Sequence, residues 1–122
     1  MQPEERDAAL LWDMREAACE IAQFIKGVSY DEFESQKVLR YAVERQILVI
    51  GEAAGRVSSN LRGAHPEIPW GSIIAQRNIL AHEYGEILVE RIWRVASEHI
   101  PELIRLLDPL IPELPKQNSG HL

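Results

Sequence analysis

The sequence predicts an all-α fold, an up-down bundle of four to five helices, and three observations lead to this prediction. Apolar residues recur every three or four positions over long segments, which is typical of amphipathic helices. No segment of the sequence alternates apolar and polar residues in the way that half-buried strands do. The chain has 122 residues, 46% of them hydrophobic, which suits one domain with a real core.

The first expected helix covers about residues 5 to 26 and ends near Gly27. Its apolar face is a stripe of residues three or four positions apart: Leu10, Met14, Ala18, Ile21 and Ile25. A second, long helix is expected from about 31 to 62, with Asp31 and Glu34 as a capping pair. Its apolar stripe runs through Val38, Ala42, Val49, Ala53 and Val57. We expect this helix to be the spine of the fold.

Residues 62 to 72, "RGAHPEIPWGS", contain two glycines, two prolines and a serine, which mark a loop between helices. A third helix should start near Trp70 or Ser72 and fade between His82 and Gly85, where glycine can end a helix. Its apolar residues are Ile73, Ile74, Ile79 and Leu80.

A fourth helix is expected from about 86 to 99, and Pro101 should start or kink a short fifth one. We assign residues 1–111 to a single helical domain. Residues 112–122 are rich in proline and polar residues, so we expect a disordered C-terminal tail there.

The segment "GEAAG" at positions 51 to 55 lacks the lysine and the preceding strand of a phosphate-binding loop. Glycines four positions apart on a helix more often allow two helices to pack closely. We therefore interpret this segment as a helix-packing site.

Charge is unevenly distributed along the chain. The formal net charge is -6, and the acidic residues are concentrated near the N-terminus. Taken alone, this balance argues against nucleic-acid binding, and no DNA partner is expected. Residues 36 to 62 are the exception, with five basic residues: Lys37, Arg40, Arg45, Arg56 and Arg62. A solvated face is the commoner explanation of such charges, but Arg40 and Arg45 are candidates for contacts with an RNA backbone.

No run approaches the ~18 apolar residues that a membrane span needs, and the acidic start differs from a signal peptide. We therefore expect a cytoplasmic protein with no membrane partner. The one cysteine, Cys19, has no Cys or His neighbour at metal-site spacing. We expect no metal or other cofactor, and we interpret Cys19 as a core residue.

The stretch "RNILAHEYG", residues 77 to 85, places Arg77, His82 and Tyr84 close together in an otherwise apolar helix. Histidine titrates near neutral pH, so His82 could take a proton from a ribose 2'-hydroxyl or return one to the leaving oxygen. Arginine stays charged and offers a planar fork of donors, so Arg77 could hold a phosphate and stabilise its transition state. Neither role requires a metal.

Geometry and composition leave a structural alternative open. Five positions on an ideal helix are roughly 140° apart, so Arg77 and His82 would not share a face. They converge only if the helix ends or bends between them, or if the length of the arginine closes the gap. Composition alone favours a surface arginine, a histidine at a helix end and a packed tyrosine.

The same stretch resembles the R-x4-H-x-Y signature of HEPN ribonucleases, in particular the HepT-like toxins of HepT-MntA (type VII) toxin-antitoxin pairs. Two flanking segments are similar to that family as well. "YAVERQILVIGEAAGRVS", at 41 to 58, resembles its long second helix, and "ILVERIWRVASEHIPEL" resembles the helix after its motif. The resemblance covers about residues 5 to 110.

The resemblance implies a homodimeric helical bundle that acts as a metal-independent endoribonuclease through 2'-hydroxyl attack. Arg77 and His82 match the catalytic pair of the family, and Asn78 matches the polar residue that commonly follows the arginine. Tyr84 matches the tyrosine that an MntA-type nucleotidyltransferase antitoxin modifies with AMP, which silences the toxin. The implied partners are RNA as substrate, the antitoxin and a second copy of the chain.

A second hypothesis belongs to another class of protein: a non-catalytic dimeric HEPN module that binds a nucleotidyltransferase partner or a nucleotide. The low overall basicity of the chain motivates it. An assay of RNA cleavage by the purified protein discriminates between the two hypotheses.

Overall fold

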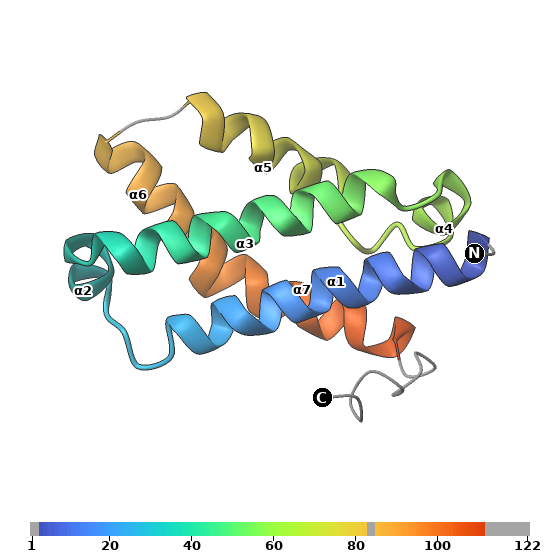
Figure 1. Cartoon of the computed structure of the whole chain (residues 1–122), viewed down its shortest axis with the longest axis horizontal. Coiled ribbons are helices and arrows are strands. Elements are labelled where there is room, and N and C mark those ends of the chain that lie inside the picture. Colours follow the sequence, from blue (N-terminus) through green and yellow to red (C-terminus); the bar gives the residue numbers. More distant parts are fainter. Residues whose placement is uncertain (1–2, 83–84, 112–122) are drawn as a thin grey trace.

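The computed structural model describes residues 3–82 and 85–111, and the regular structure within these ranges is helical (Figure 1). The α-helices are α1 (Pro3–Phe24), α2 (Tyr30–Ser35), α3 (Lys37–Arg56), α4 (Ser59–Ala64), α5 (Trp70–His82), α6 (Gly85–Arg94) and α7 (Ile100–Leu107). A π-helical turn, η1 (Val95–His99), joins α6 to α7, and a 3-10 turn, η2 (Asp108–Leu110), follows α7. The predicted all-α helical bundle is confirmed.

Helix α3 lies at the centre of the bundle, and the other long helices pack around it (Figure 1). α1 runs antiparallel to α3 along one side, and α5 packs on another side of α3. α7 packs against α1 and completes the core. The fully enclosed side chains come from α1, α2, α3, α6 and α7 and include Met14, Ile21, Phe33, Val43, Ile92 and Leu107.

Helix α1 forms as predicted and buries the predicted face. Leu10, Met14, Ala18 and Ile21 are buried, and Ile25, in the turn that follows, packs partly against the core. Gly27 has a φ of 74°, a left-handed conformation that glycine adopts without a steric penalty, and it redirects the chain towards α2. Cys19 is half-buried at the flank of the helix, so its interpretation as a core residue was wrong.

The predicted stripe is only partly buried. Ala53 and Val57 are buried and Val49 packs against the core, but Val38 is 81% exposed. Most of the core contact of α3 comes from residues outside the stripe: Val43, Ile47, Ile50 and Ala54. α3 carries apolar residues on two sides, and periodicity alone does not say which side will be covered. The side with Val38 and Tyr41 remains open to solvent.

The single helix expected from 31 to 62 is in fact three helices. The first break is at Gln36, whose extended backbone (φ -107°, ψ 91°) separates α2 from α3. The second is at Val57, which is also extended (φ -66°, ψ 141°). Ser58 then caps α4 by accepting a hydrogen bond from the amide of Leu61 at 3.2 Å. Serine oxygens compete with backbone carbonyls for such amides, which favours a new helix start over continuation of the old helix.

The cap of α2 was also predicted at the wrong residues. Ser29, rather than Asp31, is the N-cap: its hydroxyl accepts from the amide of Glu32 at 3.1 Å. The Glu32 carboxylate accepts from the amide of Ser29 at 2.8 Å, which completes a reciprocal capping box.

The fourth and fifth predicted helices are joined in one helical run from Gly85 to Leu107. Within η1 the amide of Ile100 donates to the carbonyl of Val95, five residues earlier, where an α-helix would use the fourth. Pro101 has no amide proton and cannot supply the next α-helical bond. Pro101 lies in the first turn of α7, as predicted, and the short fifth helix follows the fourth without a loop.

Two further predictions concern membrane spans and the C-terminal tail. No helix within residues 3–82 and 85–111 is long and apolar enough to cross a membrane. Residues 112–122, the predicted tail, lie outside the described residues, so the domain boundary after 111 stays a prediction.

Candidate catalytic site at the end of α5

Arg77 lies on α5 and is held by an ion pair with α3. Its Nη1 donates to Oε2 of Glu52 at 3.0 Å, and the two side chains are 48% and 56% exposed. Exposed pairs of this kind contribute about 0–1 kcal/mol to stability, so the contact orients Arg77 more than it stabilises the fold. The pair uses one of five guanidinium N–H groups, which leaves donors for another anion.

The crossing of α3 and α5 sets the position of this pair. Gly51 is buried where the helices meet, and a Cβ there would come within 3.3 Å of the carbonyl oxygen of Ile73. The absent side chain lets the helices approach closely, as the "GEAAG" segment predicts. Gly55 has no such neighbour within 4 Å, so the packing interpretation holds for Gly51 alone. Because Glu52 follows Gly51, the close crossing brings its carboxylate to α5.

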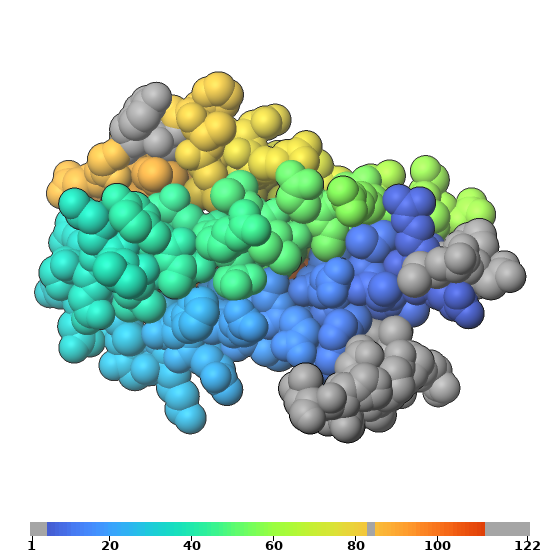
Figure 2. All heavy atoms as spheres, in the orientation of Figure 1, coloured from blue at the N-terminus to red at the C-terminus, as the bar shows by residue number. Residues whose placement is uncertain are grey.

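His82 and Asn78 are exposed on α5, which forms a ridge along the upper edge of the molecule in Figure 2. The helix continues unbroken through His82, so it does not end between the arginine and the histidine as convergence would require. On a regular helix the two side chains leave the axis about 140° apart and about 7.5 Å apart along it. Within the described part of one chain, Arg77 and His82 are therefore not brought together.

Tyr84, the predicted modification site, lies outside the described residues. Directly after it, Gly85 begins α6 with a φ of 63°, a backbone conformation that favours glycine. Glycine at this position lets α6 start at an angle to α5, as the two arms at the upper left of Figure 1 show.

Helix α6 is anchored away from α5 by an aromatic cluster. The ring of Trp93 lies 5.1 Å from that of Phe33 and 6.0 Å from that of Tyr30, both on α2. Ile92, the residue before Trp93, is fully buried. This packing fixes the base of α6, while Ile87, near its start, is 62% exposed.

The two arginines predicted to contact RNA have different surroundings. Arg40 donates from Nη1 to the backbone carbonyl of Glu34 at the end of α2, so it has a structural role that the sequence did not indicate. Arg45 is exposed and lies seven residues before Glu52, on the same face of α3. Of the two, Arg45 shares a surface with the Arg77–Glu52 pair.

Glu52 is the site residue that sequence reasoning missed. It lies 25 positions from Arg77 on a different helix, and no motif or spacing links the two. Nearby on α3, burial raises the pKa of the Glu44 carboxyl, and the charge of Arg40 opposes this rise. Among residues 3–82 and 85–111, no group of three or more His, Cys, Asp or Glu side chains is arranged to hold a metal ion.

Known proteins resemble the chain over most of its length. A family model described as "Ribonuclease HepT-like" matches residues 14–110. "Putative RNase MJ1380" of Methanocaldococcus jannaschii is 36% identical over 95 residues, which cover 78% of this chain and 87% of that protein. "Probable ribonuclease HepT" of Thermococcus cleftensis is 33% identical over 93 residues, which cover 76% and 84%. No solved structure matches the chain significantly.

A helical bundle that exposes an arginine and a histidine at the end of one helix fits the class of small, all-helical ribonucleases. The matches narrow this class: the chain belongs to the HepT-like ribonuclease family. The resemblance of the chain to that family is thereby confirmed. A further relative, "Putative RNase MJ1216" of M. jannaschii, aligns over 98% of this chain at 30% identity, so the similarity extends well beyond the motif.

Proposed function

We propose that the protein is an endoribonuclease that cleaves RNA by attack of a ribose 2'-hydroxyl on the adjacent phosphate. The observation that carries the proposal is the exposed arginine and histidine of the R-x4-H motif, on a chain of the HepT-like ribonuclease family. Both side chains lie at the surface, where a polymer can reach them.

Each step of the reaction has a residue suited to it. His82 takes the proton of the 2'-hydroxyl as its oxygen attacks phosphorus, and an imidazolium returns a proton to the departing 5'-oxygen. The products are a 2',3'-cyclic phosphate and a free 5'-hydroxyl. Arg77 stabilises the extra negative charge on the phosphorane with its N–H groups not used by Glu52. Asn78, the next residue along α5, is also exposed and would hydrogen-bond the substrate.

A homodimer is part of the proposal because one chain does not bring the two catalytic side chains together. Three large apolar residues are exposed among the described residues: Val38, Tyr41 and Ile87, on α3 and α6. Such residues favour contact with another apolar surface. A two-fold partner seated there would place two motifs across one cleft, so that each phosphate meets groups from both copies.

We also propose that the protein is a toxin silenced by an antitoxin. Tyr84 is the proposed site of this regulation. An MntA-type nucleotidyltransferase would transfer AMP from ATP to the tyrosine oxygen and release pyrophosphate. The added phosphodiester charge and nucleotide would lie two residues from His82 and repel the RNA phosphate. A Tyr84→Phe chain should then neither gain AMP mass with this enzyme and ATP nor lose activity, and modification of that variant would refute the assignment.

The catalytic assignment is tested by Arg77→Ala and His82→Ala. Each should reduce cleavage of single-stranded RNA by roughly 10²–10⁴-fold, as expected when a general acid-base or a charge-stabilising group is removed. Thermal unfolding should barely change because the Arg77–Glu52 pair is exposed. His65→Ala, which removes a histidine outside the motif at the end of α4, is the matched control. Wild-type cleavage by both motif variants would exclude this mechanism.

The second candidate is a non-catalytic dimeric module that binds a nucleotidyltransferase or a nucleotide. It is favoured by the net charge of -6 and by the engagement of Arg40 and Arg77 with groups of the protein itself. Wild-type protein that binds the nucleotidyltransferase and leaves all tested RNAs intact would support this candidate.

A further inference from the structure

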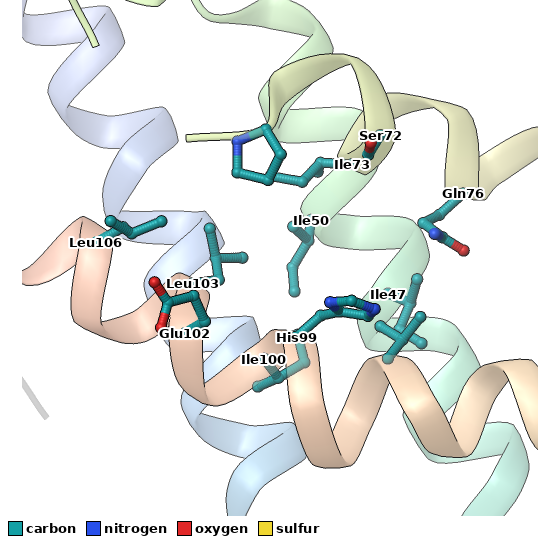
Figure 3. A pocket seen from close by; sticks show the side chains of 12 residues that line it. Ile47, Ile50, Ser72, Ile73, Gln76, His99, Ile100, Glu102, Leu103 and Leu106 are labelled. Carbon is teal, nitrogen blue, oxygen red and sulfur yellow. The ribbon is translucent and has the colours of Figure 1, made fainter. Parts of the chain in front are cut away.

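A cavity of about 290 Å³ lies between α3, α5 and the run from η1 to α7 (Figure 3). Its walls are largely aliphatic and include Ile47, Ile50, Ile73 and Leu103. This size is near the lower end of small-ligand pockets, and apolar walls with a few polar groups are typical of them.

Gln76 carries an unpaired polar atom at this cavity. Its Oε1 is buried and has no hydrogen-bond partner among the described residues. If the amide were turned over, a buried donor would be unpaired in its place, so either orientation needs a polar partner. The two other such atoms are Nε of Arg62 and of Arg91, which belong to guanidinium groups with further N–H groups.

The opposite wall is built by the π-helical turn. η1 contributes Val95 and His99 to the lining, and Figure 3 shows the imidazole of His99 extending from its helix while Gln76 extends from α5. Single π turns inside helices occur frequently at functional sites. The cavity thus combines an unpaired amide, a π turn and an exposed imidazole.

The polar lining restricts the chemistry of an occupant. Ser72, Gln76 and His99 offer hydrogen-bond donors and acceptors, and no lysine or arginine lines the cavity. The carboxylate of Glu102 is already paired with Arg105. An anionic group would find no lysine or arginine as a counter-charge here, whereas a neutral, flat group with a donor beside an acceptor would pair with both the oxygen and the nitrogen of an amide.

We propose that this cavity binds an adenine base. The Gln76 oxygen would accept from the exocyclic amino group and its nitrogen would donate to a ring nitrogen, the pairing by which amides read adenine. Adenine presents a donor beside an acceptor on both its Watson–Crick and its Hoogsteen edge, whereas the Hoogsteen edge of guanine offers two adjacent acceptors and would leave the amide oxygen unpaired. Gln76 directly precedes Arg77 on α5, so the base could belong to RNA held by the motif, and this part rests on the proposed function.

Binding of free adenosine tests the cavity without reference to cleavage. Titration calorimetry of the full chain with adenosine and with guanosine should show saturable binding and a preference for adenosine. Gln76→Met, nearly equal in shape, should weaken adenosine binding at least about fivefold, as expected for the loss of a bidentate amide contact. Gln23→Met, an exposed glutamine on α1, is the matched control. No saturable adenosine binding, or equal binding by Gln76→Met, would overturn the proposal.

A second measurement distinguishes the two sources of the base. If the base belongs to the RNA substrate, sequencing of cleavage products should show an adenine preference at one position, and Gln76→Met should erase it. If the site takes a free nucleoside, adenosine still binds while the cleavage pattern of the variant matches wild type. Adenosine binding by a chain that cuts no RNA would retain the cavity and reject the ribonuclease proposal.

Discussion

Asp7 is buried, and both of its carboxylate oxygens are used. Oδ1 accepts from the amide of Ser58 at 2.9 Å, and Oδ2 accepts from its hydroxyl at 2.6 Å. These bonds join the start of α1 to the cap of α4, which follows the spine helix. One carboxylate thereby fixes two segments that are 51 positions apart.

Replacing this carboxylate should destabilise the protein measurably. Asp7→Ala leaves the amide and hydroxyl of Ser58 without their acceptors, at a cost of about 1–3 kcal/mol in the free energy of unfolding. Urea unfolding followed by circular dichroism measures this loss. Asp13→Ala, at an exposed position on α1, is the control and should change stability by about 0.5 kcal/mol or less. Equal effects of the two variants would contradict the assigned role of Asp7.

The partly buried carboxyl of Glu44 should make the protein less stable as pH rises. Burial raises the pKa of its carboxyl in the folded protein, so ionisation destabilises the fold as pH rises. Glu44→Gln should therefore be slightly more stable than wild type at pH 7, by about 0.5 kcal/mol or less for a half-exposed group. The difference should disappear below the ordinary glutamate pKa of 4.5. Unfolding at pH 7 and pH 3.5 measures it, and Glu20→Gln should show no such gain.

At the residue scale, the sequence identified the motif but not its partner. Arg77 and His82 were named from spacing, and both are exposed on α5. The contact of Arg77 with Glu52 could not be predicted because it depends on how α3 and α5 cross. The carbonyl contact of Arg40 was missed for the same reason, since a break between α2 and α3 creates the free carbonyl.

At the scale of elements, the boundaries of α2, α3 and α4 depend on caps as much as on apolar periodicity. The signal for the α2 cap is present in the sequence, because Ser29 and Glu32 have the S-x-x-E spacing of a capping box. The sequence indicates the break between α3 and α4 at Val57 less clearly than it indicates the α2 cap. It is stabilised by Asp7 through Ser58, a contact that sequence periodicity does not reveal.

Removing the α2 cap should destabilise this element more than a comparable change elsewhere. Ser29→Ala removes the acceptor for the Glu32 amide and should cost about 0.5–2 kcal/mol. Hydrogen exchange of the α2 amides should rise at the same time. Ser59→Ala changes an exposed serine at the first position of α4 and serves as the control. Unchanged exchange in α2 would show that the cap is dispensable.

At the scale of the whole molecule, the exposed side of α3 is the feature that one chain leaves uncovered. Val38 and Tyr41 are 81% and 58% exposed. Placing an ammonium group in an apolar interface is costly, so Val38→Lys should shift a dimer towards monomers. Sedimentation velocity measures this shift, and Gln23→Lys on the exposed face of α1 should leave it unchanged. A Val38→Lys protein that sediments with the wild type would remove this face from the proposed interface.

The sequence by itself determined the helical class, the buried face of α1, the loop before α5 and the position of the Arg77–His82 motif. These properties depend on local spacing and on glycine and proline, which act over a few residues. The tertiary structure decided that Val38 at the start of α3 stays exposed, where the spine helix breaks, which acid holds Arg77 and where a cavity meets Gln76. Each of these depends on contacts between helices far apart in the chain, and local periodicity carries no information about them.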